Sequence, residues 1–288
     1  LLFTAVVVMA LPPVTEVNGT RVSFVDKVDQ LAAAVSHLRY DEAIGVDLEG
    51  EALGRYGTIL TLQLLSSGRD PVVYVVDVML LGSSAFEDAG LRRLLESESP
   101  KKLFFDVRAD ANALFYHFNV RMVPQGVVDL QLLATCAMVR QGNSAEYLTG
   151  LAALMRNPRY LTHLSRDQRA RIQEVKGIAA KLFQPEHGGS YAVWRSRPLD
   201  PVLLEYVTDV QYFHHLHRQL QKSATGLSEP LLQATARRID FAHSESYSRN
   251  LDRDFFRLAD TQLLTDVRAA LGIAAPWQEH SYQSRRRY

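Results

Sequence analysis

Three apolar runs separated by short polar turns constrain the fold of this chain more than any other feature. They cover residues 43–49, 58–65 and 72–78, and the polar segment 66–70 joins the last two. Strands that follow one another at such short spacing pair as antiparallel neighbours. We therefore expect an antiparallel β-meander at the centre of the fold.

Helices and further strands flank this meander in the sequence. A strand is expected at residues 21–26, an amphipathic helix at 28–38, a helix at 86–97, a strand at 102–106, a helix at 110–118 and an apolar stretch up to 128. Helices are then expected at 130–140, 146–155, 166–182, 201–221 and 254–271. The helix at 201–221 has a clear start, because Asp200 is a good N-cap and Pro201 suits the first helical position. The fold class is therefore α/β, with a mixed sheet, flanking helices and a helical C-terminal half.

Length and composition allow one large domain or one domain with an appendage. The 288 residues are 47% hydrophobic, and Cys136 is the single cysteine. One cysteine excludes an internal disulfide and a zinc site built on several thiolates, which favours a reducing compartment. The apolar start, residues 1–11, stops at Pro12 and falls short of the roughly 20 residues that span a bilayer. It also lacks the basic flank of a signal peptide, so we interpret it as a truncated start or a stray strand. We expect an intracellular protein of the cytoplasm or nucleus with no membrane partner.

Charge is distributed unevenly although the net charge is zero. Residues 41–100 carry eleven acidic side chains and four arginines, whereas residues 156–197 carry nine basic side chains and three acidic ones. An acidic centre beside a basic flank is typical of a metal site that acts on a polyanion. The alternative is that the basic helices are simply solvated faces.

Two acids at the end of the first apolar run predict half of a metal site. Asp47 and Glu49 are two residues apart on a strand and so share one face, while Leu48 points into the core. Two like charges held this close repel each other unless a cation lies between them. Hard divalent cations such as Mg²⁺ bind carboxylate oxygens. The alternative for such a pair is a solvated strand edge.

Three motifs in order along the chain carry a family resemblance. They are VDLE at residues 46–49, FDVRAD at 105–110 and YVTDV at 206–210. Together they resemble the exonuclease motifs of the DEDD 3′-5′ exonuclease superfamily, in its ribonuclease D-like branch. The segment KLFQPEHGGSY at 181–191, followed by RPL at 197–199, resembles a group of poorly characterised, mainly fungal members. The resemblance implies a ribonuclease H-like fold over residues 20–222, with residues 223–288 as a partly helical C-terminal extension.

The resemblance also implies a site and a mechanism. Asp47, Glu49, Asp110 and Asp209 would be the catalytic, metal-binding residues. They would hold two Mg²⁺ or Mn²⁺ ions, of which one activates the attacking water and the other stabilises the leaving 3′ oxygen. The activity implied is hydrolysis of phosphodiester bonds from the 3′ end of single-stranded nucleic acid, with RNA preferred over DNA because no polymerase domain accompanies the motifs.

The water-positioning residue near the third motif departs from the family pattern. In the tyrosine subclass the Tyr lies four residues before the motif III Asp, whereas Tyr206 lies three before Asp209 and Glu205 takes the fourth position. Leu204 stands at the fifth position, so the histidine subclass is not supported. Positions i−3 and i−4 flank the same face of a helix, so Tyr206 is the candidate catalytic tyrosine.

Other residues near the motifs have alternative explanations. We prefer Asp110 to Asp106, which ends a strand and suits a turn or cap, and Asp129 suits the N-cap of the next helix. Phe105 and Arg108 could contact a base and a phosphate, or be a core phenylalanine and a surface arginine. We interpret three further side chains as surface or supporting residues and not as metal ligands: His214, His215 and His217.

Three functions remain open from the sequence. The first is a metal-dependent 3′-5′ exonuclease acting on RNA. The second is a nuclease-fold RNA-binding or adaptor protein with weak or no catalysis, for which the shifted Tyr206 leaves room. The third is a proofreading module acting on DNA.

Overall fold

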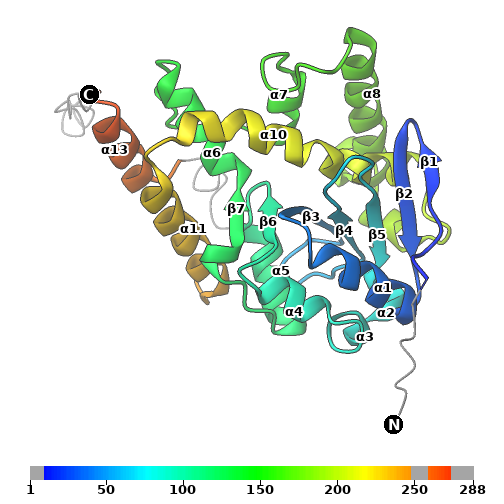
Figure 1. The fold of residues 1–288 in the computed structure, drawn as a ribbon. Helices are drawn as coiled ribbons and strands as arrows, with labels where there is room; N and C mark the ends of the chain where they lie inside the picture. The colour runs from blue at the N-terminus through cyan, green and yellow to red at the C-terminus, as the bar shows by residue number, and fades with distance from the viewer. Residues whose placement is uncertain (1–9, 248–258, 274–288) are drawn as a thin grey trace, which may run out of the picture.

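The computed structural model describes residues 10–247 and 259–273. Its centre is a seven-stranded mixed sheet in the order β1-β2-β5-β4-β3-β6-β7 (Figure 1). The strands are β1 (Thr15–Val17), β2 (Thr20–Val25), β3 (Ala43–Glu49), β4 (Thr61–Leu65), β5 (Val73–Asp77), β6 (Lys101–Phe104) and β7 (Val127–Asp129). β4 pairs antiparallel with both β3 and β5, so the predicted meander is confirmed. β2 runs parallel to β5, and β6 and β7 continue the sheet parallel to β3.

Helices cover both faces of this sheet. They are α1 (Val28–Leu38), α2 (Val78–Leu81), α3 (Ser83–Phe86), α4 (Leu91–Glu96), α5 (Arg108–Phe118), α6 (Leu130–Arg140), α7 (Leu151–Arg156), α8 (Arg166–Phe183), α9 (Pro201–Tyr206), α10 (Phe213–Leu220), α11 (Ser228–His243) and α13 (Thr261–Ala270). In Figure 1, α10 crosses the upper part of the molecule, and α1, α4 and α5 lie below it.

Alternation along β3 divides the core into two parts. Ile44, Val46 and Leu48 are buried in one apolar cluster with α1, α4 and α5. Ala43, on the opposite face, belongs to a second cluster with α6, α8, α9 and α10. Asp47 shares the face of Ala43 because side chains alternate along a strand. The acids of β3 therefore face the helical half of the protein.

Two predicted helices are shorter in the structure. Of the helix predicted at 86–97, α3 ends at Phe86 and only α4 forms beyond it. Gly90 lies just before α4 and has a left-handed φ of +81°, a conformation that glycine adopts readily. The helix predicted at 146–155 is only α7, which begins after Gly150, where the backbone is extended. The strand predicted at 58–65 begins at Thr61, and the one at 72–78 ends at Asp77.

The helix predicted at 201–221 is broken in its middle. Asp200 does cap α9, since its Oδ1 accepts a hydrogen bond of 2.7 Å from the Val202 N–H. The 3₁₀ helix η4 (Val207–Tyr212) then separates α9 from α10. η4 packs closely on β3 at Gly45, where an added Cβ would lie only 2.9 Å from Cγ2 of Val210. This close contact with the sheet is a tertiary constraint that helical periodicity does not contain.

The C-terminal region contains a helix that the sequence did not predict. α11 packs against α5 and buries Ile239 and Ala242 in the core. Its Pro230 lies in the first turn, where a missing N–H costs little. Of the helix predicted at 254–271, residues 261–270 form α13, while 254–258 lie outside the described residues. The division at residue 222 into a domain and an extension stays a prediction.

Among the described helices, none combines the length and the apolar character needed to cross a bilayer. Most of the apolar segment 1–11 lies outside the described residues.

Candidate functional site

A pocket of about 460 Å³ opens at the carboxyl ends of the parallel strands β3 and β6. We call it the acidic pocket. Its charged lining residues are Asp47, Glu49, Asp106, Asp110 and Lys176, and its aromatic ones include Phe105, Phe183, Tyr191 and Tyr206. Three of the four predicted metal ligands therefore line one pocket.

Asp47 and Glu49 reach the acidic pocket because of their positions on β3. Leu48 between them is only 3% exposed and packs into the core on the opposite face, as the alternation predicted. Burial, and next the negative charge of Asp209, raise the pKa of Asp47 to about 7. Asp209 therefore lies close enough to Asp47 to disfavour its ionisation.

Asp110 enters the acidic pocket from the first turn of α5. It is buried, with 5% of its surface exposed. The neighbouring Asp106 is paired with an arginine, because its carboxylate accepts hydrogen bonds of 2.6 and 2.7 Å from Arg108. Burial opposes ionisation of Asp106, but the bonds from Arg108 and the charge of Arg238 outweigh it, and the pKa of Asp106 is lowered. Asp106 thus acts as an ion-pairing residue of the turn before α5.

Arg108 and Phe105 have different surroundings. Arg108 is buried at 6% exposure and pairs with Asp106, so the structure contradicts the surface-arginine alternative. Phe105 is half-buried, packs against the second core cluster and lines the acidic pocket. Of the two, Phe105 is the side chain available to a bound base.

Asp209 lies on η4 and is held by a lysine. Its Oδ2 forms an ion pair with Nζ of Lys176 from α8. Burial raises the pKa of Asp209, and the adjacent Lys176 ammonium opposes that rise. Sequence reasoning did not single out Lys176. A signal was present, because Lys176 neighbours the buried positions Ile172 and Val175 on the inner side of α8.

Tyr206 lies three residues before Asp209, one fewer than in the family pattern, and the 3₁₀ geometry of η4 compensates for this difference. Residues three apart eclipse each other in a 3₁₀ helix, whereas residues four apart come closest in an α-helix. Tyr206 ends α9, and Asp209 follows within η4. Both contact Lys176, whose Nζ lies 4.9 Å from the centroid of the Tyr206 ring. Burial, and next the charge of Glu49, raise the pKa of Tyr206 well above its usual value.

Aromatic residues of the segment 181–199 pack against the ring of Tyr206. The rings of Phe183 and Trp194 lie 5.5 and 6.1 Å from the Tyr206 ring, measured between centroids. Arg197 forms an ion pair with Asp77, which is 1% exposed at the end of β5. The segment therefore connects the tyrosine to the sheet.

The sequence model of a family described as 3′-5′ exonuclease matches residues 22–224. This match covers most of the chain and includes every acid of the site. The chain belongs to the 3′-5′ exonuclease family. The predicted membership in the DEDD 3′-5′ exonuclease superfamily is confirmed.

Curated relatives of this exonuclease-family chain carry the name piRNA biogenesis protein EXD1. The protein from Mus musculus is 30% identical over 189 residues, which is 63% of this chain and 29% of the relative. The protein from Homo sapiens is 29% identical over 183 residues, 61% of this chain and 31% of the relative. The chain thus spans about a third of the length of these relatives.

Solved structures of ribonuclease D share its fold. The Trypanosoma brucei RNase D complex with RNA U12 superposes with a TM-score of 0.62 at 22% identity, covering 90% of this chain and 80% of the other. Escherichia coli RNase D gives a TM-score of 0.53 at 20% identity, covering 77% of this chain and 50% of the other. At this identity the likeness shows the fold alone, and the predicted ribonuclease H-like α/β fold is confirmed.

The exonuclease family implies divalent metals, and the acidic pocket fits them by its chemistry. Its donors are carboxylate oxygens, which Mg²⁺ and Mn²⁺ prefer. As the side chains stand, however, no three His, Cys, Asp or Glu residues within 10–247 and 259–273 are grouped closely enough to hold a metal ion. Asp209 in particular is turned to Lys176. Metal binding therefore requires the carboxylates to converge.

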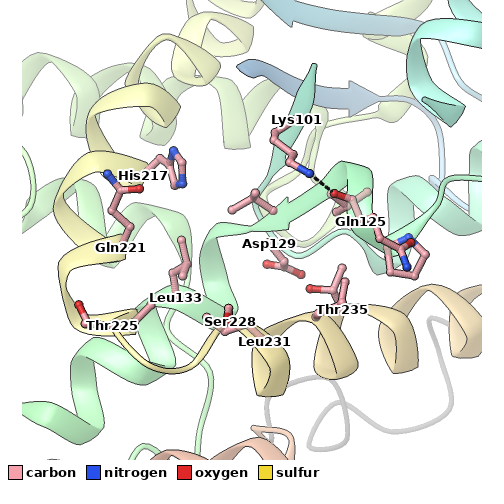
Figure 2. A pocket seen from close by; sticks show the side chains of 15 residues that line it. Lys101, Gln125, Asp129, Leu133, His217, Gln221, Thr225, Ser228, Leu231 and Thr235 are labelled. Carbon is pink, nitrogen blue, oxygen red and sulfur yellow. Dashed lines mark hydrogen bonds between the residues drawn. The ribbon is translucent and has the colours of Figure 1, made fainter. Parts of the chain in front are cut away.

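The three histidines of α10 lie in different surroundings. Nε2 of His214 lies 3.1 Å from the Ser66 carbonyl oxygen, and His215 packs against His163 with ring centroids 4.2 Å apart. His217 lines a different cavity of about 400 Å³ between β7, α10 and α11 (Figure 2). That these histidines are surface or supporting residues and not metal ligands stays a prediction.

The cavity in Figure 2 contains a carboxylate that already has several hydrogen-bond partners. Asp129 is its single acidic lining residue, and this carboxylate is 0% exposed. It accepts hydrogen bonds from the Gln131 N–H, as the predicted N-cap of α6, and from Arg238. Lys101 at the rim donates to the Gln125 carbonyl oxygen.

Proposed function

We propose that this chain is a metal-dependent 3′-5′ exonuclease that removes nucleotides from single-stranded RNA. The observation that carries the proposal is one pocket lined by acids from separate elements, with a further acid close to it. Asp47 and Glu49 from β3 and Asp110 from α5 line one pocket, and Asp209 from η4 is near enough to raise the pKa of Asp47. Residues 20–222 form the exonuclease unit in this proposal.

The four carboxylates would hold Mg²⁺ or Mn²⁺ in this site. A bound metal supplies activation of the attacking water and stabilisation of the leaving oxygen. Tyr206 is protonated at neutral pH, as tyrosine ordinarily is, and its raised pKa strengthens that preference, so its hydroxyl can orient that water. Water adds to phosphorus, the P–O3′ bond breaks, and the 3′ oxygen takes a proton. The products are a nucleoside 5′-monophosphate and a shortened strand.

Several features support RNA as the substrate. The T. brucei neighbour was solved with RNA U12, and the curated relatives are named for piRNA biogenesis. The basic stretch 156–197, which contributes α8 beside the acidic pocket, suits a polyanion. Half-buried Phe105 and Tyr191 in the pocket lining can stack on bases of single strands.

The test is degradation of 5′-labelled single-stranded RNA and DNA in Mg²⁺ or Mn²⁺ and in chelator. Wild type should give a ladder that shortens from the 3′ end, lost in chelator and in Asp47→Asn. The matched control is Asp240→Asn, since Asp240 is an exposed acid on α11 away from the acidic pocket. Intact substrate with metal-loaded wild type would contradict the proposal.

The ion pair between Lys176 and Asp209 favours a second candidate, an RNA-binding adaptor of nuclease fold. A lysine that holds one of the four acids can keep the site folded without metal. An adaptor would bind RNA equally in chelator and after Asp47→Asn, and would produce no ladder. The same RNA measured by binding and by cleavage separates the two candidates.

A further inference from the structure

Lys176 is the one positively charged side chain among the described residues that line the acidic pocket. Its side chain is 18% exposed and comes from the middle of α8. Nζ contacts Oδ2 of Asp209 and lies over the ring of Tyr206. The ammonium group therefore touches both residues of the third exonuclease motif.

Other basic residues of α8 are directed elsewhere. Arg171 forms ion pairs with Glu174 and Glu205 at the surface. Lys181 is exposed at the end of the helix and does not line the acidic pocket. Lys176 thus differs from Arg171 and Lys181 in lining the acidic pocket.

The carboxylates of the pocket need a compensating positive charge. Asp47, Glu49 and Asp110 line the same pocket, and acids held together in a partly buried site repel one another. The Lys176 ammonium group next to Asp209 reduces the repulsion between the carboxylates when no metal is bound. A divalent cation bound by the same carboxylate would repel the ammonium and compete for the same oxygen.

We propose that Lys176 is a resident counter-cation that competes with divalent metal for Asp209 and thereby lowers the metal affinity of the site. Lys176 releases Asp209 when this carboxylate binds metal, and the ring of Tyr206 then retains the ammonium through a cation–π contact. This inference rests on the proposed metal site and adds the residue that controls its occupancy.

The first experiment is calorimetric titration of the full chain with Mn²⁺. Lys176→Met removes the charge and keeps the length of the side chain, and Lys181→Met is the control on the same helix. We expect Lys176→Met to bind Mn²⁺ roughly three- to tenfold more tightly than wild type, which corresponds to the loss of one partly buried ion-pair competitor. Lys181→Met should bind like wild type.

A second experiment uses wild type alone, so it does not depend on how Lys176→Met folds. Lysines are acetylated with and without Mn²⁺ and quantified by mass spectrometry. Acetylation of Lys176 should increase with Mn²⁺, because the amine is no longer ion-paired with the Asp209 carboxylate, and acetylation of Lys181 should stay constant. Unchanged labelling of Lys176 at Mn²⁺ saturation would overturn the inference.

The outcomes separate the inference from the proposed function. Equal Mn²⁺ affinity of wild type and Lys176→Met overturns the role of Lys176 and leaves the exonuclease intact. Binding by Lys176→Met but not by wild type supports the role of Lys176 and shifts the function to the adaptor. Absence of Mn²⁺ binding in both proteins overturns both.

Discussion

At the scale of single residues, protonation decides when the acidic pocket can function. Asp47 and Asp209 are both buried carboxyl groups with raised pKa, so ionising both together is unfavourable. Metal ligands of this type must be deprotonated, which makes metal affinity depend on pH. The same property gives the folded protein a pH-dependent stability.

We predict that Asp47 makes the protein less stable as pH rises when chelator is present. Its pKa is raised from 3.8 to about 7 in the fold, so the protonated carboxyl group favours the folded state. This contribution is fully present below about pH 3.8 and is lost as pH rises through about 7. Urea denaturation at a series of pH values in chelator measures it.

The comparison for this pH dependence is Asp47→Asn. An amide does not titrate, so the fall in the free energy of unfolding between about pH 4 and 7 should be smaller in Asp47→Asn than in wild type. Asp240→Asn should keep the wild-type slope. Identical slopes for wild type and Asp47→Asn would contradict the raised pKa.

At the scale of elements, the contact between β3 and η4 places the third motif. Gly45 lets η4 approach the sheet, and Val210 next to Asp209 occupies the space that a Cβ would need. The 3₁₀ turn then brings Tyr206 and Asp209 to the same lysine. A small change on β3 should therefore move the acid on η4.

We predict that Gly45→Ala destabilises the protein by about 1 to 3 kcal/mol, since the new methyl group overpacks the contact with Val210. Mn²⁺ affinity should fall as well, because η4 and Asp209 shift away from β3. Urea denaturation and Mn²⁺ titration measure the two effects.

Gly177→Ala is the matched control for this substitution. Gly177 is exposed within α8, and an added Cβ would meet no atom within 4 Å. Alanine in a helix interior is favoured over glycine by about 0.5 to 1 kcal/mol, so this variant should be slightly more stable. If Gly45→Ala behaved like Gly177→Ala, close packing of η4 on β3 would be disproved.

At the scale of the whole molecule, α11 connects the C-terminal region to the site. Arg238 on α11 donates a hydrogen bond of 2.6 Å to Asp129, and it also lies 3.6 Å from Asp106. Asp129 accepts hydrogen bonds from the backbone N–H groups of Asp106 and Val107, which precede α5. The turn that presents Asp110 is thus held by a residue far along the chain.

We predict that Arg238→Met costs about 3 to 5 kcal/mol of unfolding free energy, because it leaves Asp129 buried without its charged partner. Metal affinity should also fall, because the turn before α5, which positions Asp110, becomes less well held. The control is the adjacent Arg237→Met, whose pair with Asp260 is 40% exposed at the arginine and should contribute about 0 to 1 kcal/mol. Equal losses in the two variants would contradict a special role of Arg238.

The sequence determined the local features of this protein. The strand at 43–49 and the helices at 28–38 and 130–140 have the predicted bounds, because hydrophobic periodicity and N-caps depend on residues close together in the chain. The same alternation placed Asp47 and Glu49 on one face, and the order of the motifs indicated the family.

The tertiary structure alone decided how these parts meet. The break of the predicted 201–221 helix at η4, the ion pair of Lys176 with Asp209 and the bond of Arg238 to Asp129 join segments that are distant in sequence. α11 escaped prediction because its buried face includes polar side chains that are satisfied only by such distant partners. Periodicity reports which face of an element is buried, whereas the partner of a buried charge depends on the packing of the whole fold.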